Sequence, residues 1–568
     1  MSDKAEAVSA ARGWRLWMVL ILLLLVAVAI VARMLSLYVT EQEFLQNQGN
    51  ARTLRSEQVP AHRGIITDRH GEALAVSAPV ATIWADPAKT DLQHMSMTQL
   101  ARLLKTDKRK LLGKLTSSRS RRFMYLQRQM DPDLAEEIRA LRIPGIHVDR
   151  DYKRYYPAAE VATHLVGFTN LDGKGQEGLE LAYDEWLQAE SGKQLVLKDR
   201  LGRTIKHINE ISPAQHGNDI QLSIDLRLQY LAYRELKTAV KAHKADGGSL
   251  VMLDAATGEI LAMVNQPSYN PNDPRQRISS ALRNRALTDT FEPGSTVKPM
   301  TVASALMSGR YKPSTQVDTS PGYIRVKGKT IRDHRNYGEI DVSTIITKSS
   351  NVGVTKLSLS LPEGSVRTLF QNIGLGQATG LGYPGESSGF LPYLNERQKI
   401  ERATLSYGYG LAVTPLQLAQ SYLALANDGV INPVSLVTGQ GSGDSVRVMP
   451  AQVARDVRKM METVISVKGT GRRAAVPGYR VAGKTGTVHK VGSGGYIDDQ
   501  YISVFAGMAP ASNPRLVTVV MVDNPKGQEY YGGEVAAPVF SRAVGGALRL
   551  LNVPPDDWPK EPNRIVGR

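Results

Sequence analysis

The chain contains no cysteine among its 568 residues. This absence excludes disulfide scaffolds, cysteine-ligated zinc, iron–sulfur clusters and cysteine nucleophiles. Acidic residues are scarce relative to basic ones, 54 against 70, which gives a formal net charge of +16. A charge of this size invites a nucleic-acid partner, so its location along the chain has to be established. The glycines and prolines show no three-residue period, which excludes a collagen-like structure.

Apolar residues, in contrast, are plentiful. They make up 42% of the chain, whereas charged residues of both signs make up 22%. This composition is typical of packed hydrophobic cores and excludes a disordered polyelectrolyte. At about 150 residues per domain, the length is enough for three or four domains.

One apolar run is long enough to cross a membrane. From Leu16 to Ala32 the sequence has 17 residues without a charge, at the short end of what spans a hydrocarbon core of about 30 Å. We predict a transmembrane helix over residues 14–33 after a cytoplasmic tail over residues 1–13. A cleavable signal peptide is the main alternative, because Ala27-Val28-Ala29 has the small-x-small pattern of a cleavage site.

The charges that flank this run predict its orientation. Lys4, Arg12 and Arg15 precede it, whereas Glu41 and Glu43 follow. The positive-inside rule then places the N-terminus in the cytoplasm and the rest of the chain outside, as a single-pass membrane protein. A translocated domain meets no genome, so we expect no nucleic-acid partner.

Residues 34–222 mix short strand patterns with basic helices, and we interpret them as an elongated α+β pedestal domain. Arg63 to Ser77 is typical of two strands joined at His70-Gly71. Arg102 to Arg122 contains nine lysines and arginines against one acidic residue, with leucines at helical spacing. We predict one or two amphipathic helices whose basic face is solvated or contacts an anionic surface or polymer.

Residues 223–552 have the pattern of a larger globular domain of the α/β (α+β) class. Two strands predicted within Gly248 to Gln266 and three predicted later in the chain enclose a mainly helical insertion of about 200 residues. We therefore predict a five-stranded antiparallel sheet covered by helices, and a disordered tail over residues 553–568. The expected elements are a helix at Asp225–Ala242, strands at Arg480–Lys490, Tyr501–Met508 and Leu516–Val522, and a helix at Thr414–Asn427.

Ser295-Thr296-Val297-Lys298 is the only Ser-x-x-Lys in the chain. The turn dipeptide Pro293-Gly294 precedes it and an apolar run follows, so we predict that Ser295 lies at a helix N-terminus, where free N–H groups stabilise negative charge. Residues i and i+3 share a helix face, which brings the lysine beside the serine hydroxyl. A neutral lysine can take the proton of that hydroxyl and activate it as a nucleophile. A capped helix with a solvated lysine remains the alternative for this motif alone.

Two further motifs carry weaker signals. Lys348-Ser349-Ser350-Asn351 offers hydroxyl and amide groups on a predicted loop between helices, although a helix cap explains it equally well. Gly483-Lys484-Thr485-Gly486-Thr487 begins a predicted strand and adds a second cation. Small residues there allow a substrate backbone to pair with the strand, and a simple strand-end turn is the alternative.

The order Ser-x-x-Lys, Ser-x-Asn, Lys-Thr-Gly matches the signature of penicillin-binding proteins and class A β-lactamases. The chain resembles a class B penicillin-binding protein over almost its whole length, and most closely the division-specific (septal) enzyme. The segments that carry the resemblance outside the three motifs are Arg63-Gly64 to Gly71, Gly178-Leu179-Glu180, Asp199-Arg200 with Gly202, Phe291 to Ser295, Tyr407 to Asn427, Tyr531-Gly532-Gly533 and Ala537 to Phe540.

The resemblance implies a serine-type D-Ala-D-Ala transpeptidase that cross-links peptidoglycan stem peptides and is acylated by β-lactams. It assigns Ser295 as the nucleophile, Lys298 as its base and Ser349 as a proton relay. It further implies that Lys484 lowers the pKa of Lys298. Asn351, with Ser350, Thr485, Gly486 and Thr487, would bind substrate, and the backbone N–H groups of Ser295 and Thr487 would form the oxyanion hole.

The resemblance also suggests a membrane glycosyltransferase and other divisome proteins as partners, and we predict no cofactor and no metal. An elongation-specific transpeptidase, a D-Ala-D-Ala carboxypeptidase and a β-lactamase-like hydrolase remain alternatives. Thr485 stands where many relatives have serine, and we expect His489 to face solvent.

Overall fold

The computed structural model describes residues 3–44, 54–198, 204–395, 397–439, 443–492 and 494–557, with the backbone alone for residues 3–13. The chain divides into two compact units, Met1–Ala61 with Ala189–His216 and His62–Gln188 with Gly217–Arg568. The predicted pedestal contributes to both of them. Asp199, Arg200 and Gly202, which carry part of the family resemblance, lie outside the described residues.

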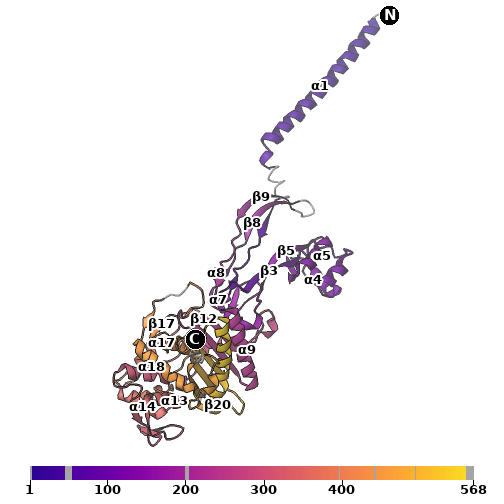
Figure 1. Ribbon diagram of the computed structural model, residues 1–568. Coiled ribbons are helices and arrows are strands. Elements are labelled where there is room, and N and C mark those ends of the chain that lie inside the picture. The colour runs from indigo at the N-terminus through magenta and orange to yellow at the C-terminus, as the bar shows by residue number, and fades with distance from the viewer. Residues whose placement is uncertain are drawn as a thin grey trace, which may run out of the picture. The chain divides into compact units, whose positions relative to one another are not determined.

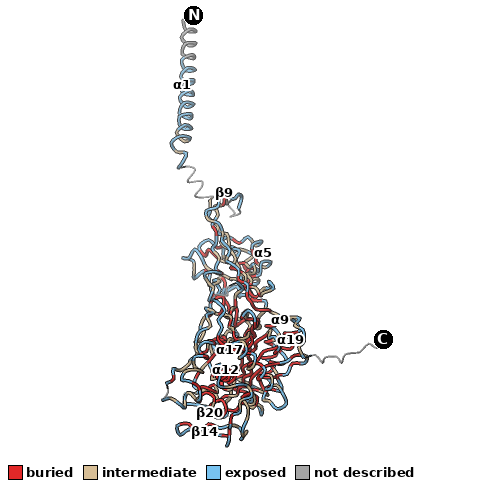
Figure 2. Tube along the Cα trace, turned by 60° about the vertical axis from the view of Figure 1, so that its left-hand side comes forward, coloured by how far each residue is buried: buried red, intermediate tan, exposed pale blue. Residues whose placement is uncertain are grey.

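The first unit contains the predicted apolar helix. Helix α1 runs from Asp3 to Val39, and its part from Trp14 to Val39 is long and apolar enough to cross a membrane. Its residues from Trp14 to Val39 are exposed almost throughout (Figure 2), as expected for a helix that has no protein core to pack against. An antiparallel sheet of order β1-β8-β9 accompanies it, made of Leu54–Val59, Gly192–Lys198 and Thr204–Ser212.

In the second unit, residues 62–188 with 217–222 form a sheet around the long strand β3, with helices α3, α4 and α5 packed on it (Figure 1). The bounds are β2 (Ile66–Thr67), β3 (Ala73–Ala85), α3 (Met97–Leu103), α4 (Lys108–Ser117), β4 (Met124–Met130), α5 (Pro132–Ala140), β5 (Ile146–Tyr155), α6 (Thr163–Val166), β6 (Phe168–Thr169), β7 (Gly175–Glu177), α7 (Gly178–Ala182), α8 (Asp184–Leu187) and β10 (Ile220–Gln221).

The basic run of this region forms two helices, α3 and α4, as predicted. Leu100, Leu111 and Leu115 are buried against the sheet, whereas the nine lysines and arginines between residues 102 and 122 are all exposed. The leucine spacing therefore identified the buried face, and the basic side chains lie on the exposed face, as predicted.

A buried ion-pair network connects the pedestal segments. Glu180 is fully buried and accepts hydrogen bonds from Arg63 and Arg154, each at 2.6 Å. Arg63 also pairs with Asp184 at 2.7 Å. Such a carboxylate is stable in the interior only because both of its oxygens meet charged donors. The network gives a structural role to the Arg63-Gly64 and Gly178-Leu179-Glu180 segments.

Residues 223–552 contain the predicted five-stranded antiparallel sheet, in the order β12-β11-β21-β20-β19. Helices α9 and α19 cover one face (Figure 1), and α17 packs on the other. The strands and covering helices are α9 (Leu226–Ala242), β11 (Gly247–Asp254), β12 (Ile260–Gln266), α17 (Pro415–Ala426), β19 (Ala482–Gly492), β20 (Gly495–Ala509), β21 (Leu516–Asp523) and α19 (Gly532–Leu550).

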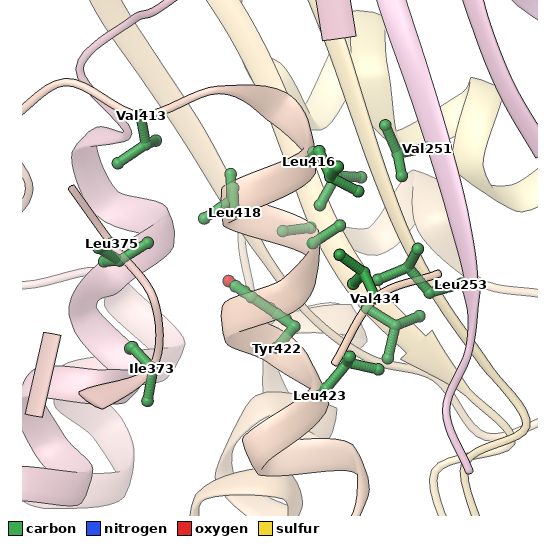
Figure 3. Packing of buried hydrophobic residues seen from close by; sticks show 14 of the residues in the cluster. Val251, Leu253, Ile373, Leu375, Val413, Leu416, Leu418, Tyr422, Leu423 and Val434 are labelled. Carbon is green, nitrogen blue, oxygen red and sulfur yellow. The ribbon is translucent and has the colours of Figure 1, made fainter. Parts of the chain in front are cut away.

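Both faces of this sheet are buried, which explains its nearly continuous apolar strands. Leu250 and Met252 of β11 point toward α9 and α19, and the alternate residues Val251 and Leu253 point toward α17. Figure 3 shows α17 with Leu416 and Leu423 near Val251 and Leu253, while Ile373 and Leu375 lie on its other side. Helix α17 is thus the center of the core between sheet and insertion.

The insertion is mainly helical, as predicted, but it also holds short strand pairs that the sequence patterns did not reveal. Its elements are α10 (Ser279–Leu282), α11 (Arg285–Thr288), α12 (Lys298–Met307), β13 (Gln316–Asp318), β14 (Tyr323–Val326), β15 (Lys329–Arg332), β16 (Glu339–Asp341), α13 (Val342–Lys348), α14 (Asn351–Ser360), α15 (Ser365–Asn372), α16 (Lys399–Leu405), β17 (Val430–Ile431), β18 (Val446–Arg447) and α18 (Ala451–Glu462).

The start of the predicted disordered tail is packed on the domain. Asp556 accepts hydrogen bonds from the Arg480 backbone N–H at 2.7 Å and from the Ser512 hydroxyl at 2.6 Å. The backbone oxygen of Val553 accepts from the Tyr479 hydroxyl. Order therefore extends at least to residue 557, and residues 558–568 lie outside the described part of the chain.

Candidate active site

Ser295 lies in a single 3-10 turn, Gly294–Val297, that leads directly into α12. The turn is fixed from behind, because the Tyr422 hydroxyl of α17 donates to the Thr296 backbone oxygen at 2.6 Å. The Gly294 N–H donates to the Gly408 oxygen at 3.0 Å, and a Cβ at Gly408 would lie 2.1 Å from the Gly294 oxygen. Glycine at 408 is therefore required for this close approach. Ser295 itself stays partly exposed, at the predicted helix start.

Strand β19 passes close to this turn. A Cβ on Gly486 would lie 2.9 Å from Thr296 Cγ2 and 3.2 Å from the Pro293 oxygen. β19 is an edge strand of the sheet. Its Thr485 backbone oxygen faces the site, as its 3.1 Å hydrogen bond from Lys484 Nζ shows. Backbone groups of alternate residues face the same edge, so the Thr487 N–H does too. Among the described residues no other strand pairs with this edge of β19, which lies beside Ser295.

The Ser349 hydroxyl lies between the two lysines. Lys298 Nζ is 3.1 Å from Ser349 Oγ, and Lys484 Nζ is 2.9 Å from the same atom. Lys298 also donates to the Ser349 backbone oxygen at 2.5 Å and to Asn351 Oδ1 at 2.7 Å. Three segments distant in the sequence therefore meet at one hydroxyl. Within the described residues no hydrogen bond joins Lys298 to the Ser295 hydroxyl.

Both lysines are fully buried, and burial penalises their charged forms. Burial, together with the charge of Lys484, holds the pKa of Lys298 well below its usual range, although Asp333 opposes the shift. Burial lowers the pKa of Lys484 to about 7. The pair therefore favours a neutral Lys298, the form that can accept a proton.

Ser349 has the left-handed backbone conformation, with φ of 59°, at the end of α13. A non-glycine residue adopts this conformation at a cost of about 1–2 kcal/mol, and such strain concentrates at functional sites. Ser350 follows as the N-cap of α14, where its hydroxyl accepts from the Gly353 N–H at 2.8 Å and donates to Asp333 at 2.6 Å. The predicted loop is thus a two-residue break between helices.

Ser350 is placed differently from our expectation. We expected it among the substrate-binding residues, but it is fully buried and its hydroxyl already serves two partners inside the protein. A helix cap, the alternative considered above for this motif, describes Ser350, whereas Ser349 and Asn351 face the lysines. Within this tripeptide, Ser350 has a structural role as a helix cap, whereas Ser349 and Asn351 belong to the site.

The two threonines of β19 have hydrogen bonds within the domain. The hydroxyls of Thr485 and Thr470 are 2.7 Å apart, and Thr487 Oγ1 accepts from the Gly532 N–H at 2.9 Å. As an acceptor in that bond, Thr487 keeps its own proton for a ligand.

Three features near the site were not found from the sequence. Asp333 approaches the motif from the segment after β15, and Glu292 accepts from the Gly410 N–H at 2.8 Å and from the Tyr496 hydroxyl at 3.2 Å. Asp333 belongs to no motif, and Glu292 lies in the Phe291–Ser295 segment, where no role was predicted for it. His489 is half-buried with its ring 4.7 Å from that of Tyr501, rather than facing solvent.

Ser295, two buried lysines, a hydroxyl between them and an open strand edge form a site suited to acyl transfer through serine. Family comparisons agree with this chemistry. Residues 248–545 match the penicillin binding protein transpeptidase domain, and residues 58–222 match the penicillin-binding protein dimerisation domain. The chain belongs to the class B penicillin-binding proteins.

Related proteins match nearly the whole chain. The Escherichia coli peptidoglycan D,D-transpeptidase FtsI is 45% identical over 93% of this chain and 90% of its own length. The probable peptidoglycan D,D-transpeptidase PbpC of Pseudomonas aeruginosa is 40% identical over 97% and 98%. These matches confirm the resemblance predicted from the motifs.

Solved structures match as well. The transpeptidase domain of penicillin-binding protein 3 from Burkholderia pseudomallei has 43% identity and a TM-score of 0.55, covering 60% of this chain and 98% of that domain. Penicillin-binding protein 3 of Mycobacterium tuberculosis, in complex with aztreonam, has 30% identity and a TM-score of 0.68, covering 88% and 98%. The predicted fold class is therefore confirmed.

Proposed function

We propose that the chain is a peptidoglycan D,D-transpeptidase that cross-links stem peptides through an acyl-enzyme on Ser295 during septal wall synthesis. The observation that carries the proposal is the Ser349 hydroxyl between Lys298 and Lys484, beside the turn that presents Ser295. The septal role rests on the similarity to the E. coli protein.

In the acylation step, Ser295 Oγ attacks the carbonyl carbon between the two terminal D-alanines of a donor peptide. Its proton passes to neutral Lys298 as the new ester bond forms. The amide bond then breaks, and the departing D-alanine nitrogen takes a proton relayed through Ser349. The Ser295 and Thr487 N–H groups would stabilise the oxyanion, and Asn351 would bind the substrate amide.

The hydrogen bonds of Lys298 fit a neutral amine. A neutral lysine has two N–H groups and one lone pair, and the Ser349 backbone oxygen and Asn351 Oδ1 can accept only. These two oxygens therefore take both N–H groups. The lone pair remains for a hydroxyl proton, which is what a general base requires.

In the second step, an amine from a neighbouring strand attacks the ester carbonyl, forms the cross-link and returns Ser295 to its hydroxyl form. Thr485, Gly486 and Thr487 would hold the donor along β19, with the terminal carboxylate near the threonine hydroxyls. β-Lactams mimic the terminal dipeptide and would acylate the same serine.

The flanking charges of the apolar helix support a single-pass protein of the inner membrane with its N-terminus in the cytoplasm and its transpeptidase domain in the periplasm. A membrane glycosyltransferase and other divisome proteins are the partners that fit this role. The predicted domains, residues 34–222 and 223–552, remain our proposal for the periplasmic organisation, after a tail over 1–13 and a span over 14–33.

Product analysis tests this function. The full-length protein is incubated with glycan strands that carry pentapeptides, and the released D-alanine is compared with the cross-linked peptide formed. We expect one D-alanine per cross-link. Free D-alanine without cross-links would indicate a carboxypeptidase, and rapid β-lactam turnover would indicate a hydrolase. Depletion in cells should give filaments, whereas rounded cells would indicate elongation instead of septation.

A further inference from the structure

Asp333 anchors the Ser349-Ser350-Asn351 turn from outside the three motifs. Its carboxylate accepts from the Ser350 hydroxyl at 2.6 Å, from the Asn351 N–H at 2.5 Å and from the Val352 N–H at 3.0 Å. These donors belong to the first turn of α14, where a negative charge is favoured by the helix dipole. Three charge-assisted bonds to consecutive residues fix the turn tightly.

The segment that carries Asp333 is itself fixed. The Asp333 backbone N–H donates to the Gly322 backbone oxygen at 2.9 Å, and Gly322 has a positive φ of 90°. The neighbouring Arg332 oxygen accepts from Asn351 Nδ2 at 3.0 Å. This bond orients the Asn351 amide so that Oδ1 faces Lys298, because Oδ1 and Nδ2 lie on opposite sides of one planar group.

Asp333 thereby acts on the strained residue next to its own partners. Ser349 is held in the left-handed conformation, and the residues that follow it are the three that Asp333 binds. Without this anchor the turn can relax toward a less strained backbone, which would carry Ser349 Oγ away from the two lysines.

Asp333 also contributes a negative charge that acts on Lys298. The charged groups that act on Lys298 are Lys484 from β19 and Asp333 from the segment after β15. The α13–α14 turn presents Ser349 and Asn351, which are neutral.

We propose that Asp333 is a positioning residue for acylation, which holds Ser349 and Asn351 against Lys298 and Lys484 and places its negative charge near Lys298. The proposal rests on the proposed function, since it assumes that Ser295 is acylated. Asp333 touches neither the substrate nor Ser295 in this role, so it acts through the turn and through its charge.

The test compares Asp333→Asn with Asp341→Asn in the full-length protein. Asp341 is a matched control, because its carboxylate also caps a helix, accepting from the Thr344 N–H at 2.7 Å, but it does not bind the motif. Acylation is measured with a fluorescent penicillin, alongside thermal unfolding. We expect Asp333→Asn to slow acylation by about 10- to 100-fold relative to Asp341→Asn. Equal acylation rates in the two variants would overturn the proposal.

The pH dependence of acylation separates a positioning role from a general loosening of the domain. Asp333 raises the pKa of Lys298, so its neutralisation should lower that pKa and move the acid limb of acylation to lower pH. A loosened, hydrated site would instead let the pKa rise and move the limb to higher pH, which would contradict the proposal.

If Asp333→Asn does not fold, Ser350→Ala provides the second test. It removes one of the three bonds and keeps the carboxylate, so acylation should slow without a shift of the acid limb to lower pH. Wild-type acylation in this variant would overturn the proposal. If the wild-type protein is not acylated at Ser295 under the same conditions, the proposed function itself fails.

Discussion

Lys298 and Lys484 share one partner, the Ser349 hydroxyl, which lies 3.1 Å from Lys298 Nζ and 2.9 Å from Lys484 Nζ. The lysines come from α12 and β19, so this contact connects the helical insertion with the edge strand of the sheet. Two cations at one buried point are unfavourable for the fold, and they are retained where a neutral amine is needed.

Replacement of Lys484 by methionine should stabilise the protein. Burial lowers the pKa of Lys484 to about 7, so the folded state binds this proton more weakly than the unfolded state. The destabilisation caused by burying the charged Lys484 is complete below pH 7 and disappears as the pH rises from about 7 to 10.5. We expect a gain of about 1–2 kcal/mol at pH 6, a smaller gain at pH 10, and loss of acylation. Thermal unfolding at both pH values measures the gain in stability, and a larger gain at pH 10 than at pH 6 would contradict this account.

A methyl group at Gly486 should impair acylation more than folding. The added Cβ would lie 2.9 Å from Thr296 Cγ2, so β19 has to move away from the Ser295 turn. We expect acylation to fall by about 10- to 100-fold, because small displacements of reacting groups cost this much. Gly494→Ala, in the β19–β20 hairpin with nothing within 4 Å, is the control and should acylate normally. Normal acylation in Gly486→Ala would show that β19 does not have to approach Ser295 this closely.

Glu180→Gln should destabilise the second unit without abolishing acylation in the molecules that remain folded. The change leaves Arg63 and Arg154 buried without a shared charge, at a cost of about 3–5 kcal/mol. The control is Asp172→Asn, which breaks the 2.8 Å pair with Arg128 at an aspartate that is 73% exposed and should cost about 1 kcal/mol or less. Thermal unfolding compares them, and equal effects would refute a role for the network.

The basic surface of α4 offers a prediction about location rather than chemistry. Its lysines and arginines are exposed, far along the chain from the catalytic motifs. Replacing Lys108, Arg109, Lys110 and Lys114 by glutamine should weaken localisation at the division site and leave acylation intact.

Fluorescence microscopy of tagged protein measures this localisation. The control replaces four exposed lysines of the transpeptidase domain, Lys241, Lys244, Lys399 and Lys459. Unchanged localisation of the α4 variant would show that the basic surface is not needed for localisation. Loss of acylation in this variant would show that its effect is not confined to localisation.

The fold was predictable where the signal is local. The helices predicted at Asp225–Ala242 and Thr414–Asn427 correspond to α9 and α17. Local caps fix their N-termini, Asp225 for α9 and Thr414 with Gln417 for α17. The central strands β11, β12 and β21 stood out because their residues are nearly all apolar and are buried on both faces of the sheet. The strands of the short pairs β13–β16 and β14–β15 have only three or four residues each, too few for a periodic pattern.

The site was predictable to the extent that its residues share motifs. Ser295, Lys298, Ser349, Asn351 and Lys484 were identified from spacing and family resemblance, and the structure brings the two lysines together with Ser349 and Asn351.

The rest of the site depends on tertiary contacts. Asp333 meets the motif only because a hairpin folds back on α14, and Ser350 turns inward because α14 needs an N-cap. His489 packs among tyrosines contributed by other segments. Contacts between segments that are distant in the sequence leave no periodicity or motif spacing from which they could be predicted.

The most direct test of the account is the site of penicillin attachment. Full-length protein is labelled with a penicillin, digested and mapped by mass spectrometry, with Ser295→Ala as the paired variant. We predict one adduct, on the peptide that contains Ser295, and none in Ser295→Ala, whose thermal unfolding should match the wild type. A stable adduct on another residue, or covalent labelling of a folded Ser295→Ala protein, would contradict the assignment of Ser295 as the nucleophile.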